Sequence, residues 1–399
     1  MRALALILVS ACAVDSADFT NEQPGIGSGS AIGSGSDTGS GSGSGSAART
    51  CVAQRAVFIS GGNGGLAWFT QVWPVPYVID NFAGSYAFDD PSKVTSLTVE
   101  AAHPLYGRNI GDHAIWPATA MVIGTNEAHT VSPTSTTSYA GIGLQAAVAS
   151  LQTALPSTIP VVQFANGGYY GGATNAPDPL VVADVSTAIA AFPADVQAQL
   201  TPSNDQLLRY NILATTQAQV DFGTQLAFTA NALSLGLVTT VALPGTNDDP
   251  HDAFDNGQVP TQYSDSMAIA LDAFYADLAA APDPSCDSSL ADNTVMVING
   301  DTYKAPFDRI GWNDATPGVS NVAYVRSNGF LRTGWFAPLG AGVRTSFDVT
   351  NGDTIDYDEA TTKDPDDAAA FASVLYAVSR GNRTAVTNIV DVPYTGLIR

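Results

Sequence analysis

The sequence predicts an α/β fold with a mostly parallel central sheet flanked by helices. Four short apolar runs are each followed by residues that include glycine, asparagine, aspartate or histidine. Strands that are buried in a parallel sheet have such continuous apolar sequences. Segments with helical spacing alternate with such runs, which favours a sheet covered on both faces. The 399 residues, 45% of them hydrophobic, suffice for a sizeable buried core. The four runs are Ala56–Ser60, Ala120–Ile123, Val238–Leu243 and Val295–Ile298.

The chain opens with a pattern typical of an export signal. Arg2 precedes a short apolar stretch that ends in small residues and is too short to span a membrane as a helix. Val9-Ser10-Ala11-Cys12 resembles the bacterial lipobox, in which the signal is cut before the cysteine and the thiol is acylated. We therefore expect residues 1–11 to be a lipoprotein signal peptide and Cys12 to carry the lipid. An ordinary secretory signal cut elsewhere is the alternative.

Residues 12–50 are predicted to be a disordered linker. Gly27–Ser46 is dominated by Gly-Ser repeats, which bury too little apolar surface to offset the entropy of ordering. Such a coil has an r.m.s. reach of roughly 30–35 Å. We expect residues 51–399 to form one α/β domain, held by its lipid to a membrane and facing the periplasm or the cell surface.

The strongly negative net charge of the chain limits the kinds of molecule that it can bind. The formal net charge is -22, from 37 acidic and 15 basic residues. Such a surface repels nucleic acid and anionic lipid. Nucleic acid is therefore excluded as a partner, and the membrane is expected to be reached through the lipid on Cys12. The acidic surface is interpreted as a solvated coat that keeps an exported protein soluble.

Lipidation of Cys12 leaves two cysteines, Cys51 and Cys286. An exported chain with one remaining pair favours a disulfide between them. Closing so long a loop contributes at most about 5 kcal/mol in the chain-entropy model. Two unrelated free thiols are the alternative. No C-x-x-C spacing occurs, so a zinc-cysteine site and a thioredoxin motif are excluded.

The middle of the chain alternates between helical and strand patterns. Gly143–Leu155 is rich in alanine, leucine and glutamine and is predicted to be a helix that stops before Pro156. Ile159–Ala165 is predicted to be a buried strand, and Val181–Phe192 a helix. Ala323–Val325 is a further short strand.

Three longer helices are predicted from their caps and breakers. The first runs from Asn204 to Leu235, with Gly223 as its candidate dividing point and Gly236 as its terminator. The second covers Thr261–Ala281. In the third, Asp364-Pro365 reads as an N-cap followed by proline at the first helical position, which starts a helix over Asp366–Ser379.

A glycine-rich turn, Gly61–Gly65, follows the first predicted strand. Its backbone N–H groups could approach a phosphate or sulfate, and a turn that needs positive φ is the other interpretation. The spacing matches neither G-x-G-x-x-G nor a P-loop. The candidate ligand-binding residues are Gly61, Gly62, Asn63 and Lys304.

Asp249-Pro250-His251 is the sharpest candidate for a metal site. The two side chains are two residues apart in an extended segment, so both can reach one cation, and carboxylate and imidazole are ordinary ligands of divalent metals. An acidic loop with a salt-bridged histidine is the alternative. The expected metal ligands are Asp249, His251, Asp301 and Asp314, and the expected ion is zinc, manganese or calcium.

His129 is followed by a run of hydroxyl residues. A hydroxyl near a metal can act as a nucleophile, so His129, Thr130 and Ser132 are the candidate catalytic residues. The alternative is a polar loop. No G-x-S-x-G motif occurs to support a serine triad.

Taken in order, these segments resemble a family of exported bacterial proteins known as domain of unknown function fifteen-oh-one. Ala56–Leu66 resembles the family's opening strand and its Gly-Gly-Asn-Asp-Gly-Leu turn. Asn126–His129 looks like its Asn…Ser-His segment, and Asp249-Pro250-His251 resembles its Trp-Asp-Thr-His motif. Asn299–Pro306 is similar in place to its Ser-Glu-Phe-Gly-Arg-Thr-Pro stretch, and Gly311–Asp314 to its Gly-Thr-Asp-His.

The resemblance implies membership of the alkaline phosphatase and sulfatase superfamily. It implies divalent metals at the strand ends and a metal-dependent hydrolase of phosphate or sulfate esters. The sequence departs from the family at Gly64, where the family has an acidic ligand, and at Ala315, where it has a histidine. These departures favour an alternative function, a non-catalytic surface lipoprotein that binds a small molecule, an envelope component or a partner protein on the same fold.

Overall fold

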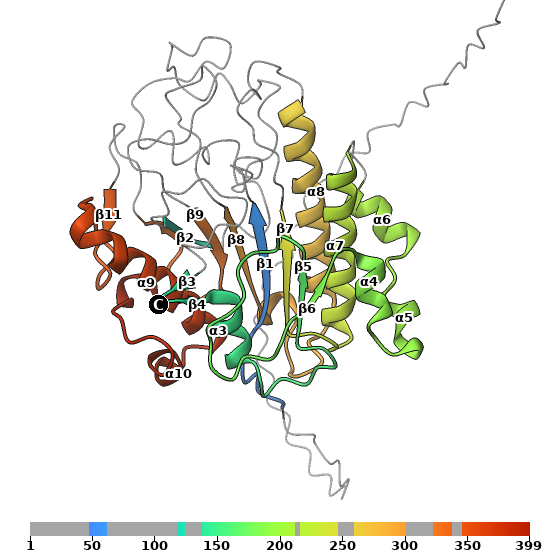
Figure 1. Ribbon diagram of the computed structural model, residues 1–399, viewed down its shortest axis with the longest axis horizontal. Coiled ribbons are helices and arrows are strands. Elements are labelled where there is room, and N and C mark those ends of the chain that lie inside the picture. The colour runs from blue at the N-terminus through green and yellow to red at the C-terminus, as the bar shows by residue number, and fades with distance from the viewer. Residues whose placement is uncertain are drawn as a thin grey trace, which may run out of the picture. The chain divides into compact units, whose positions relative to one another are not determined.

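An eight-stranded sheet forms the centre of the computed structural model, which describes residues 48–61, 119–123, 138–211, 216–245, 259–300, 322–336 and 345–399 (Figure 1). The strand order is β10-β2-β9-β8-β1-β7-β5-β6. Seven of these strands run in one direction, and β9 is antiparallel to both its neighbours. The prediction of an α/β fold with a mostly parallel sheet is therefore confirmed. The strands are β1 Arg55–Gly61, β2 Thr119–Ile123, β5 Val161–Phe164, β6 Leu180–Val182, β7 Thr240–Pro244, β8 Thr294–Gly300, β9 Val322–Arg326 and β10 Gly334–Trp335.

Helices cover both faces of the sheet, with α4 to α8 on one side and α3, α9 and α10 on the other (Figure 1). The first group is α4 Val185–Ala190, α5 Ala194–Leu200, α6 Asn204–Asn211, α7 Gln217–Ser234 and α8 Val259–Ala280. The second group is α3 Leu144–Leu151, α9 Glu359–Val378 and α10 Arg383–Thr387. Two small hairpins, β3 Ser138–Tyr139 with β4 Ile142–Gly143 and β11 Thr345–Phe347 with β12 Thr354–Asp356, complete the described strands.

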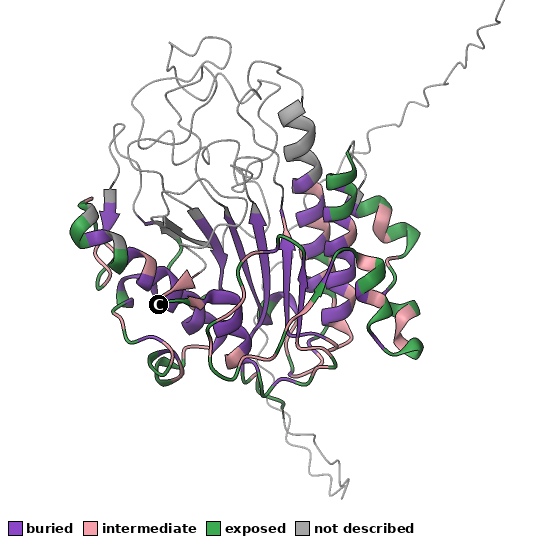
Figure 2. Cartoon of the chain, in the orientation of Figure 1, coloured by how far each residue is buried: buried purple, intermediate pink, exposed green. Residues whose placement is uncertain are grey.

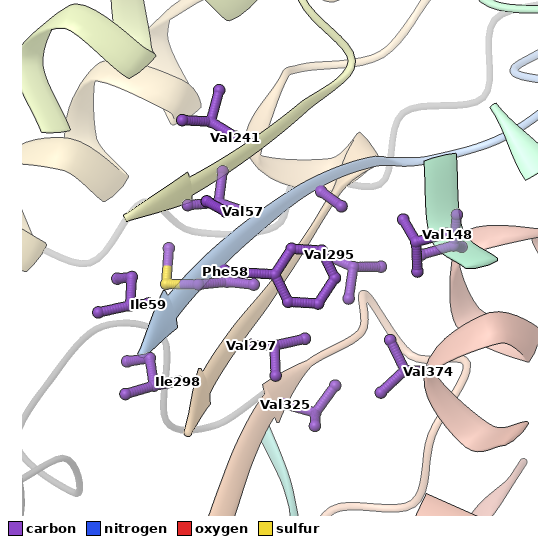
Figure 3. Packing of buried hydrophobic residues seen from close by; sticks show 14 of the residues in the cluster. Val57, Phe58, Ile59, Val148, Val241, Val295, Val297, Ile298, Val325 and Val374 are labelled. Carbon is purple, nitrogen blue, oxygen red and sulfur yellow. The ribbon is translucent and has the colours of Figure 1, made fainter. Parts of the chain in front are cut away.

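The central strand β1 shows why its residues read as an unbroken apolar run. Phe58 projects toward Val148 of α3 and Val374 of α9, while Val57 lies beside Val241 of β7 (Figure 3). Both faces of the strand are therefore packed, and β1 is buried from Arg55 to Ser60 (Figure 2). A strand covered on both faces needs no polar alternation, which is why the apolar runs predicted strands correctly.

The long helix predicted over Asn204–Leu235 is wrong as a single element. It is divided into α6 and α7, and the division precedes Thr216 rather than falling at Gly223. Thr216 accepts a hydrogen bond from the backbone N–H of Gln219, whose side chain bonds back to Thr216, forming a capping box. Gly223 is buried inside α7. Gly236 does follow the helix, in a left-handed conformation with φ +68°.

Three other boundaries differ from the prediction. Val181–Phe192 is not one helix, because residues 180–182 pair with β5 as β6 and Asp184 caps the shorter α4 through Thr187. α3 ends at Leu151, short of the predicted Leu155. The last long helix begins at Glu359 instead of Asp366, because Asp358 caps it by accepting from the backbone N–H of Ala360, and Pro365 lies within it.

A disulfide joins Cys51 to Cys286, with Cα atoms 4.9 Å apart. This is the pair that the cysteine count predicts. Arg49 reinforces the connection, since its backbone N–H and its Nε donate to the carboxylate of Asp287. The start of the described chain is thus fixed beside the loop that leads into β8. The structure describes no helix that is long and apolar enough to cross a membrane.

Candidate functional site

The strand directions bring four separate parts of the chain to one edge of the sheet. β1, β2, β7 and β8 all run the same way, so they end at the same edge, at Gly61, Ile123, Pro244 and Gly300. The carboxyl edge of such a sheet is where α/β proteins usually bind ligands. Each of the motifs singled out in the sequence follows one of these four ends.

Of the predicted site residues, the structure describes Gly61 and the disulfide pair. Gly61 is the last residue of β1 and is paired with Gly300 of β8. The others lie outside the described residues, namely Cys12, Gly62, Asn63, His129, Thr130, Ser132, Asp249, His251, Asp301, Lys304 and Asp314. Residues 1–11 and 12–47 of the predicted signal peptide and linker lie outside them as well.

At this edge, Ser60 and Asn299 form a buried polar pair on the two central strands. They are register partners near the ends of β1 and β8, and both are almost completely buried. The Ser60 hydroxyl lies 3.2 Å from Oδ1 of Asn299 and 3.3 Å from the carbonyl oxygen of Gly167. Two polar side chains therefore follow the apolar packing of Ala56–Ile59 in β1 and Val295–Ile298 in β8.

Helix α3 runs antiparallel to these strands, with its first turn at the same edge. Gln145 in the first turn donates to the carbonyl of Gly167, at 2.6 Å. Gln152, just past the other end, donates to the carbonyl of Gln54 and accepts from the hydroxyl of Thr240, both at the amino ends of their strands. The N-cap residue of α3 is Gly143, which has no side chain to cap the first turn.

The loop after β5 closes over the polar pair. Gln163 donates to the carbonyl of Gly168, at 2.7 Å. Gly168 has φ +110°, and a Cβ there would lie 2.5 Å from Nε2 of Gln145 and 3.0 Å from Oγ of Ser60. Any other residue would adopt a strained backbone here, displace the side chain of Gln145 and press on that of Ser60. Ser60, Gln145, Gln163, Gly167, Gly168 and Asn299 are called the amide cluster below.

One polar atom of the amide cluster has no partner. Nδ2 of Asn299 is buried and makes no hydrogen bond. An unpaired buried N–H group costs about 1–3 kcal/mol, so it calls for an explanation. The cluster contains no acidic or basic side chain, and the described part of the chain holds no group of three metal-ligating side chains.

A separate hollow of about 450 Å³ lies near the other end of α3. It is lined by uncharged side chains that include Ser150, Leu151, Thr174 and Asn388. The nearby Tyr170 hydroxyl donates to the carbonyl of Pro177, and burial together with the charge of Asp178 raises the pKa of Tyr170 to about 12. The phenol therefore stays protonated and holds this loop. None of the side chains that line the hollow is charged or holds a buried polar atom without a partner, so the hollow is the weaker candidate for a site.

Sequence reasoning missed the amide cluster as a site. Ser60 and Asn299 had a visible signal, because each is the first polar residue after an apolar run. Gln145 and Gln163 had none, since glutamine is common on exposed helix and strand positions. Only the folded structure shows that these two amides, one on α3 and one on β5, are buried.

Comparison with known proteins finds no family model and no curated protein that matches the chain. The α/β fold is established by the strand order and directions. Kinship with the alkaline phosphatase and sulfatase superfamily is a proposal that rests on the sequence motifs.

Proposed function

We propose that this chain is an exported lipoprotein, anchored through Cys12, whose α/β domain hydrolyses a phosphate or sulfate ester. The observation that best supports this proposal is the shared direction of β1, β2, β7 and β8. Because each predicted motif follows one of these strands, the fold offers a single edge at which acids, imidazoles and hydroxyls can converge.

The proposed roles follow the chemistry of the side chains. Carboxylates and imidazoles would hold a divalent ion, which would polarise the oxygens of the ester. A hydroxyl beside His129 would attack the phosphorus or sulfur atom and displace the alcohol of the ester, which would leave with a proton. Water would then cleave the new bond to the hydroxyl oxygen and release phosphate or sulfate. The proposed metal ligands are Asp249, His251, Asp301 and Asp314, the candidate nucleophiles are Thr130 and Ser132, and Gly61, Gly62, Asn63 and Lys304 would contact the substrate.

Metal content and ester hydrolysis test this function directly. The full-length protein is expected to carry a stoichiometric amount of zinc, manganese or calcium and to cleave aryl phosphates or aryl sulfates. Replacing Asp249 or His251 with alanine should remove the metal and lower kcat/KM at least 100-fold. The matched control is Asp195→Ala, which removes an exposed carboxylate from the first turn of α5. A protein that binds no divalent ion and cleaves neither ester would overturn the proposal.

A second function is favoured by Gly64 and Ala315, which stand where the resembling family has a carboxylate and an imidazole. Losing both would leave a ligand-binding protein without catalysis. Such a protein should show a higher Tm with its ligand, because a ligand that binds only the folded state stabilises it. Its Tm should not respond to divalent ions, and it should not turn over esters.

A further inference from the structure

Two features that carry hydrogen-bond donors lie toward the carboxyl edge of the described sheet. Asn299 holds a buried N–H group without a partner at the end of β8. The first turn of α3 brings backbone N–H groups that its N-cap residue, Gly143, cannot cap with a side chain. They are linked through one carbonyl, since Ser60 and Gln145 both lie within hydrogen-bond distance of the oxygen of Gly167.

We propose that the amide cluster and the first turn of α3 form an oxyanion-binding site for a tetrahedral phosphate or sulfate group. An oxygen of the bound group would accept the hydrogen bond that Nδ2 of Asn299 does not make in the free protein. The first turn of α3 would supply the partial positive charge of a helix N-terminus. The choice of phosphate or sulfate rests on the proposed function, whereas the site itself uses only described residues.

The chemistry of the surroundings favours an anion over a cation. Turning the amide of Asn299 over would pair its N–H with Ser60 and leave its carbonyl oxygen unpaired instead, which would suit a cation. A cation site, however, normally includes carboxylate oxygens, and the amide cluster has none. The positive end of α3 at the same place opposes a cation and favours an anion.

Burial makes the unpaired amide a strong donor for such a group. A hydrogen bond to a charged acceptor is about twice as strong as one between neutral groups. Ser60 holds the amide from one side, and Gln145 and Gln163 fix the loop that covers the pair. The donor is thus positioned before the ligand arrives, so little conformational freedom is lost on binding.

Calorimetric titration with inorganic phosphate and with inorganic sulfate tests the site. The full-length protein is treated with a chelator first, so that binding is measured without any metal. We expect one site per chain in wild type and at least a tenfold weaker affinity in Asn299→Asp, because this variant loses the N–H donor and adds a repelling charge. Asn299→Leu, which adds no charge, should weaken binding in the same direction.

The matched control is Thr294→Val on the same strand. Thr294 is also buried, and its hydroxyl has no partner, but it lies at the amino end of β8. Its substitution should leave phosphate and sulfate affinity unchanged. Near-ultraviolet circular dichroism and Tm show whether each variant is folded. Ser60→Ala replaces any variant that does not fold. It removes the contact that positions the Asn299 amide, so it should also weaken binding.

The results separate this site from the proposed function. Oxyanion binding that is lost in Asn299→Asp supports the site even if the protein binds no metal and hydrolyses nothing. Unchanged oxyanion affinity in a folded Asn299→Asp overturns the site even if hydrolysis is observed. Absence of phosphate and sulfate binding to the wild type overturns it as well.

Discussion

At the scale of single residues, the buried ion pair between Arg55 and Asp283 is the most sensitive contact in the described core. Both side chains are fully buried, with Nε of Arg55 3.3 Å from Oδ2 of Asp283, and Asn293 donates to the same carboxylate. Replacing Asp283 with alanine leaves a buried charge unpaired, so we expect a loss of about 3–5 kcal/mol in the free energy of unfolding. Denaturant titration measures it.

The control for this prediction is Asp287→Ala. Asp287 pairs with Arg49 at a similar distance, 3.1 Å, but both side chains are more than half exposed. An exposed pair contributes only about 0–1 kcal/mol. Similar losses in the two variants would contradict the importance of burial.

The same carboxylate predicts a dependence of stability on pH. Burial raises the pKa of Asp283, but hydrogen bonds from Ser285 and Asn293 and the charge of Arg55 outweigh it, so the pKa lies below its usual range. The unfolded chain then binds the proton more readily, so this contribution is complete above the unfolded pKa of about 3.9 and is lost as the pH falls toward the folded pKa. The unfolding free energy of Asp283→Asn should fall less between pH 5 and pH 3 than that of wild type. Parallel curves would refute this.

At the scale of elements, the loop after β5 depends on Gly168. An alanine there would be destabilised by about 1–2 kcal/mol because its φ is positive. Its Cβ would also lie too close to the side chains of Gln145 and Ser60. We expect Gly168→Ala to lose about 1–3 kcal/mol more than Gly141→Ala, because Gly141 has φ +80° but no atom within 4 Å of its Cβ position. Denaturation of both variants gives the difference. If both variants lose the same unfolding free energy, the loop can accommodate the alanine without disturbing the amide cluster, which contradicts the prediction.

Elements were predictable from the sequence where local patterns determine them. The runs at β1, β7, β8 and β9 identified strands whose described residues are mostly buried, and the run Ala120–Ile123 identified β2. The division between α6 and α7 was placed at Gly223, where glycine lowers helix propensity, but packing inside the helix tolerated it. The capping box at Thr216 was the informative local signal. β6 was not predicted, because it has only three residues, Leu180–Val182, and they form a strand by pairing with β5 in the folded sheet.

At the scale of the whole molecule, the sequence predicted which edge should carry the site but not its described contacts. Residues after β1 and β8 could be assigned to one edge because parallel strands end together. The amide cluster could not be predicted, because Gln145 reaches Gly167 only through the packing of α3, and Gln163 reaches Gly168 only through the fold of the loop after β5. The sequence shows which residue types follow the strands and therefore lie at one edge. The hydrogen-bond partners of buried side chains can be identified only in the three-dimensional structure.

The disulfide acts at the same scale, because Cys51 and Cys286 are separated by 235 residues. Linking them restricts the unfolded chain, and the chain-entropy model gives a stabilisation on the order of 5 kcal/mol as an upper value. Reduction of the wild type, or the double substitution Cys51→Ser with Cys286→Ser, should therefore lower the free energy of unfolding by up to this amount. The measured loss should be smaller than this upper value, because contacts such as that of Arg49 with Asp287 still hold the segments around Cys51 and Cys286 together in the reduced protein.

Denaturant titration with and without a reducing agent measures the effect, and the double variant is the control. Its unfolding curve should not respond to the reducing agent, which separates loss of the bond from any other effect of the reductant. Because the bond fixes the start of β1 beside the loop that leads into β8, reduction should weaken the amino edge first. Hydrogen exchange should then rise near Cys51 and Cys286 before it rises at Ser60 and Asn299. Simultaneous exchange at both edges would mean that the disulfide stabilises the sheet as one cooperative unit.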